Sequence, residues 1–433
     1  MIRLLAAAAA LVFCLDASGQ RPGVNYDEAK VPKYTLPDPL VMRNGDRVRD
    51  AKTWRERRRP EILELYRSEF FGRSPARPAA LNFEVASREK ALDGRAVRER
   101  ITVWLAGRDG PKMDLLLYLP AGATKPSPVF LGLGFAGNHT VSADPGVPLA
   151  EEWTRDPATG AVVKRRAEEK SRGSATEAWQ LEKVLEHGYA LATVYCGDIE
   201  PDLVGGIGFG IRPVFFRPGQ TEPAADGWGA LAAWAWGLSR AMDYLERDPG
   251  VDSRRVAVIG HSRMGKTALW AGAQDTRFSI VISNESGEGG AAITRRDFGE
   301  RIADLNRVFP YWFCGNYKKY DDREEELPVD AHMLLALIAP RPLYVASAAG
   351  DLWSDPRGEF LAVVNASPVY ELLGKQGIGT DKMPDVHQPI QHTVAYHIRA
   401  GEHGITAYDW EQYLKFADAQ WGGPVPSAGP GPR

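Results

Sequence analysis

The stretch Val256-Ala-Val-Ile-Gly260-His261-Ser262-Arg263-Met264-Gly265-Lys266 changes character in its middle. Its apolar first half is typical of a buried parallel strand, and the small residues after Lys266 indicate a helix packed on a sheet. Gly260 and Gly265 let strand and helix approach closely, and Ser262 occupies the sharp turn between them. The second glycine stands three residues after the serine, so this is a variant of the Gly-x-Ser-x-Gly elbow. The stretch predicts a strand, a turn that presents Ser262 as a nucleophile, and a helix.

The remainder of the chain places this elbow in an α/β protein. From residue 129 onward, apolar strand patterns alternate with helical patterns, which favours a mostly parallel central sheet with helices on both faces, a three-layer sandwich. The predicted strands cover residues 129–134, 189–195, 255–259, 279–283, 342–346 and 393–398, and the predicted helices cover residues 175–187, 228–246 and 359–373.

The first third of the chain is organised differently. Residues 54–71 have helical periodicity and end before a Gly-Arg-Ser-Pro turn. Residues 96–104 and 113–119 are strand patterns joined by Gly107-Arg-Asp-Gly110, which predicts an antiparallel hairpin.

Domain organisation follows from length and composition. We expect a signal peptide over residues 1–19, because Arg3 precedes a short apolar run and then small residues, and this apolar run is too short to span a bilayer. We expect one catalytic domain over residues 20–421 and a disordered, Gly/Pro-rich tail over residues 422–433. Two long insertions, near 144–172 and 295–330, are expected to be functional loops beside the carboxyl ends of strands.

The net charge and the predicted location argue against nucleic-acid and membrane partners. The 53 basic and 56 acidic residues leave a net charge of −3, so no basic field indicates nucleic acid. The signal peptide predicts a secreted or periplasmic protein, with no membrane partner. We expect a monomer, and unpaired buried thiols at Cys196 and Cys314.

A serine nucleophile needs a histidine base further along the chain. His403 lies between glycines directly after the last predicted strand, where a base can reach across the sheet, whereas His397 falls inside that strand and is expected to be packed. The spacing of His387, His392 and His397 is unremarkable, so no metal and no cofactor are predicted.

Two carboxylates compete to orient the imidazole. Asp351 follows the strand over residues 342–346, the usual position for this acid. Glu285 follows the preceding strand in a glycine-rich segment that suits an active-site floor. The sequence does not decide between Asp351 and Glu285, so both remain candidates.

Five segments together resemble the glucuronoyl esterases of carbohydrate esterase family 15, in the α/β-hydrolase superfamily. The resemblance spans residues 54–421, and the Ser-Arg-x-Gly-Lys signature is its most specific part. The long insertions resemble bacterial members, as does His261, where fungal members carry cysteine. The segments are Gly260-His-Ser-Arg-Met-Gly-Lys266, Ser283-Asn-Glu-Ser-Gly-Glu-Gly-Gly290, Asp330-Ala-His-Met-Leu-Leu-Ala-Leu-Ile-Ala-Pro-Arg-Pro342, Gly350-Asp-Leu-Trp-Ser-Asp-Pro356 and Gly401-Glu-His-Gly404.

The resemblance implies an α/β-hydrolase fold and a carboxylic ester hydrolase of the 4-O-methyl-glucuronoyl methylesterase type. Its substrates are esters between (4-O-methyl-)D-glucuronic acid of glucuronoxylan and lignin alcohols. It implies that Lys266, Glu300 and Trp353 bind the sugar. The elbow places the backbone N–H of Arg263 for the oxyanion, and the resemblance adds its guanidinium. Residues 134–139 occupy the place of the loop that often gives a second donor, and a plain Gly-rich turn is the alternative for them.

Two other functions stay open at this point. One is another secreted α/β-hydrolase, such as an acetyl xylan esterase. The other is a non-catalytic carbohydrate-binding relative, which the intact set of serine, histidine and two acids argues against.

Overall fold

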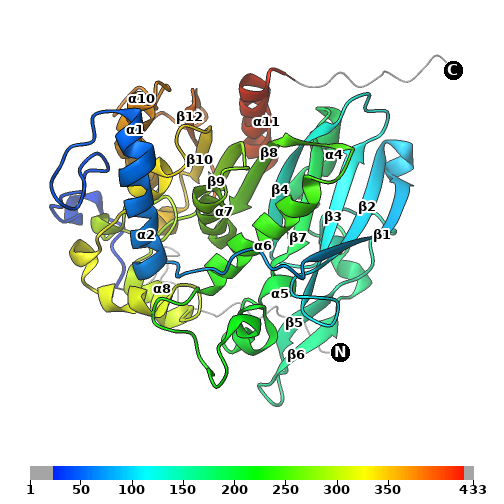
Figure 1. Ribbon diagram of the computed structural model, residues 1–433. Coiled ribbons are helices and arrows are strands. Elements are labelled where there is room, and N and C mark those ends of the chain that lie inside the picture. The colour runs from blue at the N-terminus through cyan, green and yellow to red at the C-terminus, as the bar shows by residue number, and fades with distance from the viewer. Residues whose placement is uncertain (1–22, 424–433) are drawn as a thin grey trace, which may run out of the picture.

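The computed structural model describes residues 23–423. The predicted signal peptide and residues 424–433 of the predicted tail lie outside the described residues. One ten-stranded sheet forms the centre of the described chain, in the order β1-β2-β3-β7-β4-β8-β9-β10-β12-β11 (Figure 1). Its strands are β1 (Asn82–Ala91), β2 (Ala96–Trp104), β3 (Lys112–Pro120), β4 (Ser127–Gly134), β7 (Ala190–Tyr195), β8 (Val251–His261), β9 (Ile280–Asn284), β10 (Leu343–Ala348), β11 (Ile390–Gln391) and β12 (Val394–Arg399).

The parallel part of the sheet is where strands and helices alternate. Strands β7, β4, β8, β9, β10 and β12 are parallel neighbours, whereas β1, β2, β3 and β11 pair antiparallel at the two edges. The hairpin predicted for residues 96–119 is β2–β3. All six strands predicted from residue 129 onward are present, because buried parallel strands give continuous apolar runs that are easy to recognise.

Helices cover both faces of the sheet, which confirms the three-layer α/β architecture (Figure 1). Alternate residues of a strand face opposite layers. In β8, Val256 and Val258 pack in the core with α6, α7, α9 and α10, whereas Ala257 and Ile259 pack in a second core with α4 and α11. The helices are α1 (Ala51–Thr53), α2 (Arg59–Glu69), α3 (Thr176–Trp179), α4 (Leu181–Glu186), α5 (Cys196–Ile199), α6 (Ala230–Leu245), α7 (Arg263–Gln274), α8 (Ile302–Val308), α9 (Ala331–Ala336), α10 (Pro356–Leu372) and α11 (Ala407–Trp421).

Two predicted helices differ in detail from the observed ones. The helix expected over residues 175–187 is two short helices, α3 and α4, because Gln180 between them has a left-handed backbone with φ 44°. The helix over residues 54–71 begins with a π-helical turn, Trp54–Arg58, that runs directly into α2.

The insertion near 144–172 is more than a loop. It contains a two-stranded antiparallel sheet, β5 (Glu151–Arg155) with β6 (Val162–Arg166). Its residues are half-buried or exposed, so no alternating apolar pattern marked these strands in the sequence. Glu152 of β5 accepts a hydrogen bond from the N–H of Gly137 at 2.7 Å, which fixes the hairpin against the segment after β4.

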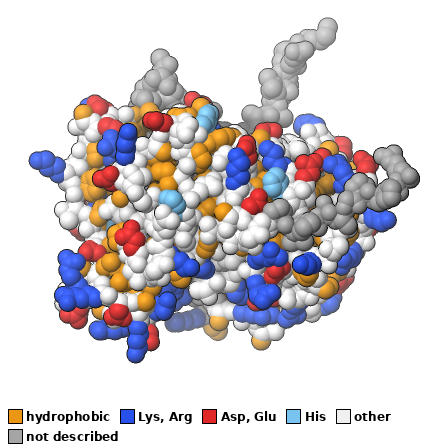
Figure 2. Space-filling view, turned by 90° about the horizontal axis from the view of Figure 1, so that it is seen from above, with side chains coloured by type: hydrophobic (Ala, Val, Ile, Leu, Met, Phe, Trp, Pro, Cys, Tyr) orange, Lys and Arg blue, Asp and Glu red, His pale blue; other side chains and the backbone are white. Residues whose placement is uncertain are grey.

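The surface carries acidic and basic side chains interspersed, as one face of the molecule shows (Figure 2). Within residues 23–423, no helix combines the length and the apolar character needed to cross a bilayer. Cys196 and Cys314 are both buried and free.

Candidate active site

The strand–turn–helix elbow is present. Ser262 joins β8 to α7 with φ 57° and ψ −131°, a positive-φ conformation outside the left-handed helical region that costs energy for a residue with a side chain. A Cβ on Gly260 would lie 1.9 Å from the carbonyl oxygen of Met264, so only glycine fits there. A Cβ on Gly265 would lie 3.0 Å from the Cβ of Ser286, which is tight but less severe. The shifted second glycine therefore gives room both to the loop after β9 and to the end of β8, because its Cβ would also lie 3.1 Å from the carbonyl oxygen of Gly260.

Four neighbouring parallel strands each deliver one predicted residue. Ser262 follows β8, Glu285 follows β9, Asp351 follows β10 and His403 follows β12. Because parallel strands end at the same edge of a sheet, residues up to 141 positions apart meet there.

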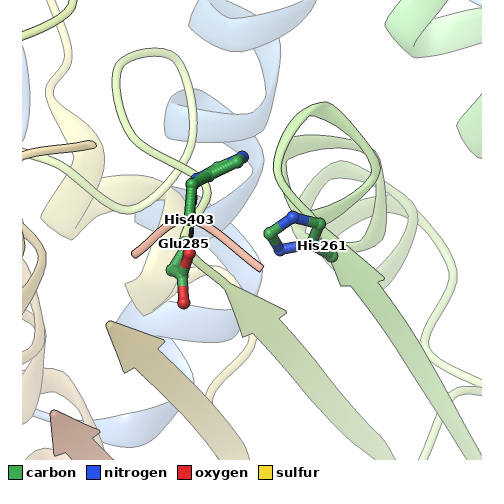
Figure 3. Close-up of side chains that lie close together, drawn as sticks. All are labelled: His261, Glu285 and His403. Atoms are coloured by element: carbon green, nitrogen blue, oxygen red, sulfur yellow. Dashed lines mark ion pairs between the residues drawn. The ribbon is translucent and has the colours of Figure 1, made fainter. Parts of the chain in front are cut away.

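The structure brings His403 against both candidate acids. Its Nδ1 lies 2.6 Å from Oδ2 of Asp351 and 3.2 Å from Oε2 of Glu285 (Figure 3 shows the Glu285 pair). Glu285 has other partners, because its Oε1 accepts from Arg399 at 2.6 Å and its Oε2 from the N–H of Gly404 at 2.8 Å. Asp351 is therefore the nearer partner of the imidazole, and Glu285 is the second carboxylate behind it.

These contacts set the charge state of the group. Partial burial lowers the pKa of His403, but its hydrogen bonds to Asp351 and Glu285 outweigh this and raise the pKa to about 10. Burial raises the pKa of Asp351, yet the contact with His403 prevails and the pKa of this carboxyl is lowered overall. For Glu285 burial dominates, and its pKa is raised. The pair of His403 and Asp351 therefore carries the stronger charge complementarity.

A second imidazole, which the sequence reasoning did not assign, lies beside the first. The ring of His261 lies 4.5 Å from the ring of His403 (Figure 3). Its Nδ1 is 2.6 Å from Oδ1 of Asn284, whose amide nitrogen donates to Asp409 and Tyr413. An amide oxygen accepts, so Nδ1 of His261 is the donor. Burial, with the nearby His403, lowers the pKa of His261 to about 3, so this ring is neutral.

His261, Glu285 and His403 place three possible metal-ligand atoms within 4.8 Å of one another. Their hydrogen bonds argue for proton chemistry instead. Both oxygens of Glu285 accept from Arg399 or Gly404, and Nδ1 of His403 faces two carboxylates. These contacts already satisfy Glu285 and Nδ1 of His403, so the cluster fits an imidazole held for proton transfer.

The three predicted sugar-binding residues form one connected group. Lys266, one helical turn beyond Ser262, is buried with 3 % of its side chain exposed. Its Nζ donates to Oε2 of Glu300 at 2.9 Å and to the carbonyl of Ser286 at 2.6 Å. Trp353 donates through Nε1 to the other oxygen of Glu300 at 2.8 Å. The lysine therefore faces the loop after β9 and not the solvent.

Arg263 lies at the start of α7, where its backbone N–H has no carbonyl one turn earlier in the helix to bind. Its side chain bonds Asp202 at 2.5 Å and lies over the ring of Phe135 at 4.5 Å, so it is held by residues outside the predicted set. In residues 134–139, the N–H of Gly137 is already taken by Glu152.

A buried carboxylate supports this arrangement from behind. Glu359 of α10 is fully buried, and its Oε1 accepts from the backbone N–H groups of Ser286 and Gly287 at 2.8 and 3.1 Å. Its Oε2 accepts from Ser347 at 2.6 Å. Glu359 therefore fixes the loop that carries both Glu285 and the carbonyl bound by Lys266. Glu359 lies three residues after the Gly350–Pro356 segment, at the start of the helix predicted over residues 359–373, but a single glutamate on a helix carries no pattern that indicates this role.

His397, the histidine predicted to be packed, is buried in β12. His397 lies between Tyr344 and Asp409, with nitrogen–oxygen distances of 2.9 Å to each. Asp409 also binds Arg399 at 2.9 Å, and Arg399 in turn binds Glu285.

A strained serine at a strand–helix elbow and a histidine backed by carboxylates, both at the carboxyl ends of a parallel sheet, define an α/β-hydrolase with the residue set of a serine esterase. Comparison with known proteins agrees. A family profile described as glucuronyl esterase, fungi, matches residues 223–374. The chain is 49% identical to carbohydrate esterase MZ0003 from an unidentified prokaryote, over 93% of each chain.

Solved structures give the same assignment. A glucuronoyl esterase from Solibacter usitatus is 64% identical, with a TM-score of 0.88 over 91% of this chain and all of that one. A promiscuous CE15 esterase from a marine bacterial metagenome is 48% identical, with a TM-score of 0.85 over 92% of this chain and all of that one. The chain belongs to the glucuronoyl esterases of carbohydrate esterase family 15, which confirms the resemblance.

Proposed function

We propose that this protein hydrolyses the ester bond between (4-O-methyl-)D-glucuronic acid of glucuronoxylan and lignin alcohols, with Ser262 as nucleophile. The observation that carries the proposal is the imidazole of His403, held 2.6 Å from Asp351 at the strand ends that also present Ser262. Family membership supports the reaction class, carboxylic ester hydrolysis of the 4-O-methyl-glucuronoyl methylesterase type.

In this mechanism Ser262 attacks the C6 carbonyl of the glucuronoyl group while His403 accepts the hydroxyl proton. Asp351 and Glu285 fix the imidazole tautomer through Nδ1 and stabilise the imidazolium. The tetrahedral oxyanion is stabilised by the N–H of Arg263, aided by the positive end of the α7 dipole. His403 then protonates the departing alcohol, and water releases the acid from the acyl-enzyme.

Sugar recognition falls to Lys266, Glu300 and Trp353. The ammonium of Lys266 and the carboxylate of Glu300, 2.9 Å apart, offer a donor and an acceptor for sugar hydroxyl groups. Trp353 fixes Glu300 and so sets the direction of its oxygens.

The test is hydrolysis of benzyl glucuronate by the wild type and by Ser262→Ala, with benzyl galacturonate and an acetyl ester as controls. We expect the variant to lose at least ~10³-fold in kcat, and the wild type to prefer the glucuronate. Equal rates on all three esters would remove the sugar assignment, and faster release of acetate would favour an acetyl xylan esterase. Binding to glucuronoxylan without labelling of Ser262 by a serine-directed phosphonate would favour a non-catalytic relative.

We also propose that the protein is exported. The support for export is the leader-like sequence of residues 1–19. Expression of the full chain in a Gram-negative host should give a periplasmic protein whose N-terminus lies near residue 20, measured by mass spectrometry. Retention of Met1 in the mature protein would contradict this.

A further inference from the structure

An apolar pocket of about 140 Å³ lies on the side of His261 away from β9. Its lining is apolar apart from Thr140, Ser174 and His261. The pocket wall includes Phe135 after β4, Ala178 and Trp179 of α3, Ile259 of β8, and Ile405. Phe135 is 41 % exposed, so an aromatic ring stands where the pocket meets the solvent.

The pocket begins beside the position where the leaving alcohol must be protonated. Nδ1 of His403 is bound to Asp351, so Nε2 is the nitrogen left to exchange protons with Ser262 and the leaving oxygen. The ring of His403 lies 4.5 Å from the ring of His261, which lines the pocket, and Ile405 follows His403 by two residues. The pocket therefore begins one imidazole ring away from the group that protonates the leaving alcohol.

The predicted sugar-binding residues lie across the sheet from the pocket. Lys266 belongs to α7, which packs in the first core, whereas Ile259 belongs to the second core with α11. The group of Lys266, Glu300 and Trp353 is polar and internally hydrogen-bonded. The acyl group and the alcohol would thus meet surfaces of opposite character on the two sides of Ser262.

We propose that this pocket binds the aromatic ring of the ester's alcohol. The proposal rests on the proposed function and adds the alcohol subsite to it. Its volume is close to that of the engineered apolar cavity of ~150 Å³ that binds benzene in another protein. Phe135 and Trp179 offer edges and faces for aromatic contact, and the rings of Phe135 and His261 already form a T-shaped pair with 6.2 Å between their centres.

The experiment compares methyl and benzyl glucuronate in the wild type, in Ala178→Phe, which fills the pocket, and in Glu177→Phe. Glu177 is the exposed neighbour on the same helix and does not line the pocket, so it is a matched control. We expect Ala178→Phe to lower kcat/KM for the benzyl ester on the order of tenfold while the methyl ester changes less than twofold. Ala178→Leu should give an intermediate loss, and Glu177→Phe should behave as wild type.

Turnover of the methyl ester distinguishes a failure of the pocket proposal from a failure of the proposed function. If Ala178→Phe leaves the ratio of the two kcat/KM values unchanged while both esters are hydrolysed, the pocket does not bind the alcohol and the proposed function stands. If the wild type hydrolyses neither ester, the proposed function itself fails. If Ala178→Phe does not fold, Ala178→Leu decides, because its unchanged ratio would equally overturn the proposal.

A binding measurement gives an independent readout. Benzyl alcohol should inhibit hydrolysis of methyl glucuronate by the wild type, and the inhibition constant should rise severalfold in Ala178→Phe but not in Glu177→Phe. Equal inhibition constants in the three proteins would contradict the assignment.

Discussion

Replacing Asp351 by asparagine tests the central geometry of the site. The substitution keeps the side-chain shape but removes the charge that lies 2.6 Å from Nδ1 of His403. Glu285 remains at 3.2 Å, so the imidazole is not left without a carboxylate. A hydrogen bond to a charged group is worth roughly 1.5–3 kcal/mol. Because 41 % of the His403 side chain is exposed, solvent screening places the loss at the lower end, about 2 kcal/mol, which is about 30-fold in kcat.

The direction of the pH effect follows from the same contacts. Hydrogen bonds to Asp351 and Glu285 raise the pKa of His403, and the base must be neutral to accept a proton. The kcat/KM of the wild type should therefore still rise with pH above 6.5, the ordinary pKa of histidine. In Asp351→Asn the imidazolium loses stabilisation, so the pKa falls and the acid limb moves to lower pH. The variant's deficit should then be larger at high pH than at neutral pH.

The assay is a pH profile of kcat/KM on benzyl glucuronate for the wild type, Asp351→Asn, Glu285→Gln and the double variant, with melting temperatures as a control for folding. Glu285→Gln should lose less than Asp351→Asn, and the double variant should lose more than the product of the two. An Asp351→Asn protein with an unchanged kcat and acid limb, beside an inactive Glu285→Gln, would refute the assignment of Asp351 as the principal partner.

Five further substitutions, at four positions, test the surroundings. Lys266→Met should raise KM for the glucuronate about tenfold, with a smaller effect on kcat. It should also lower the melting temperature, because Glu300 loses its buried partner. An unchanged KM would exclude the lysine from sugar binding. Glu359→Ala leaves two buried N–H groups unsatisfied, at about 1–3 kcal/mol each, so stability and kcat should both fall, whereas Glu359→Gln keeps an acceptor and should stay near wild type. Equal behaviour of the two would show that the carboxylate does not hold the loop. Gly260→Ala should cost about 3 kcal/mol or more in unfolding free energy, because its Cβ meets a backbone carbonyl. Gly265→Ala should cost less, because the closest contact of its Cβ is at 3.0 Å. The reverse order in a denaturant titration would contradict this account of the elbow.

The parts of the fold that the sequence predicted correctly are those with a strong local pattern. The buried strands β4, β7, β8, β9, β10 and β12 each contain an apolar run, and Gly260 marks a turn where only glycine fits. The hairpin of β5 and β6 was missed because it is exposed and has little apolar alternation. The break at Gln180 was missed because a single left-handed residue leaves no periodic signal.

The sequence by itself determined the α/β class, the position of Ser262 at an elbow, and the set of candidates around it, because these depend on local periodicity, glycine spacing and chain order. Only the tertiary structure decided that Asp351 is closer to His403 than Glu285 is, that Lys266 is buried against Glu300, and that His261 stands between the base and an apolar pocket. The physical reason is that these relations join the ends of different strands. Their distances are set by how the sheet, α7 and the loops pack, and no spacing along the chain records them.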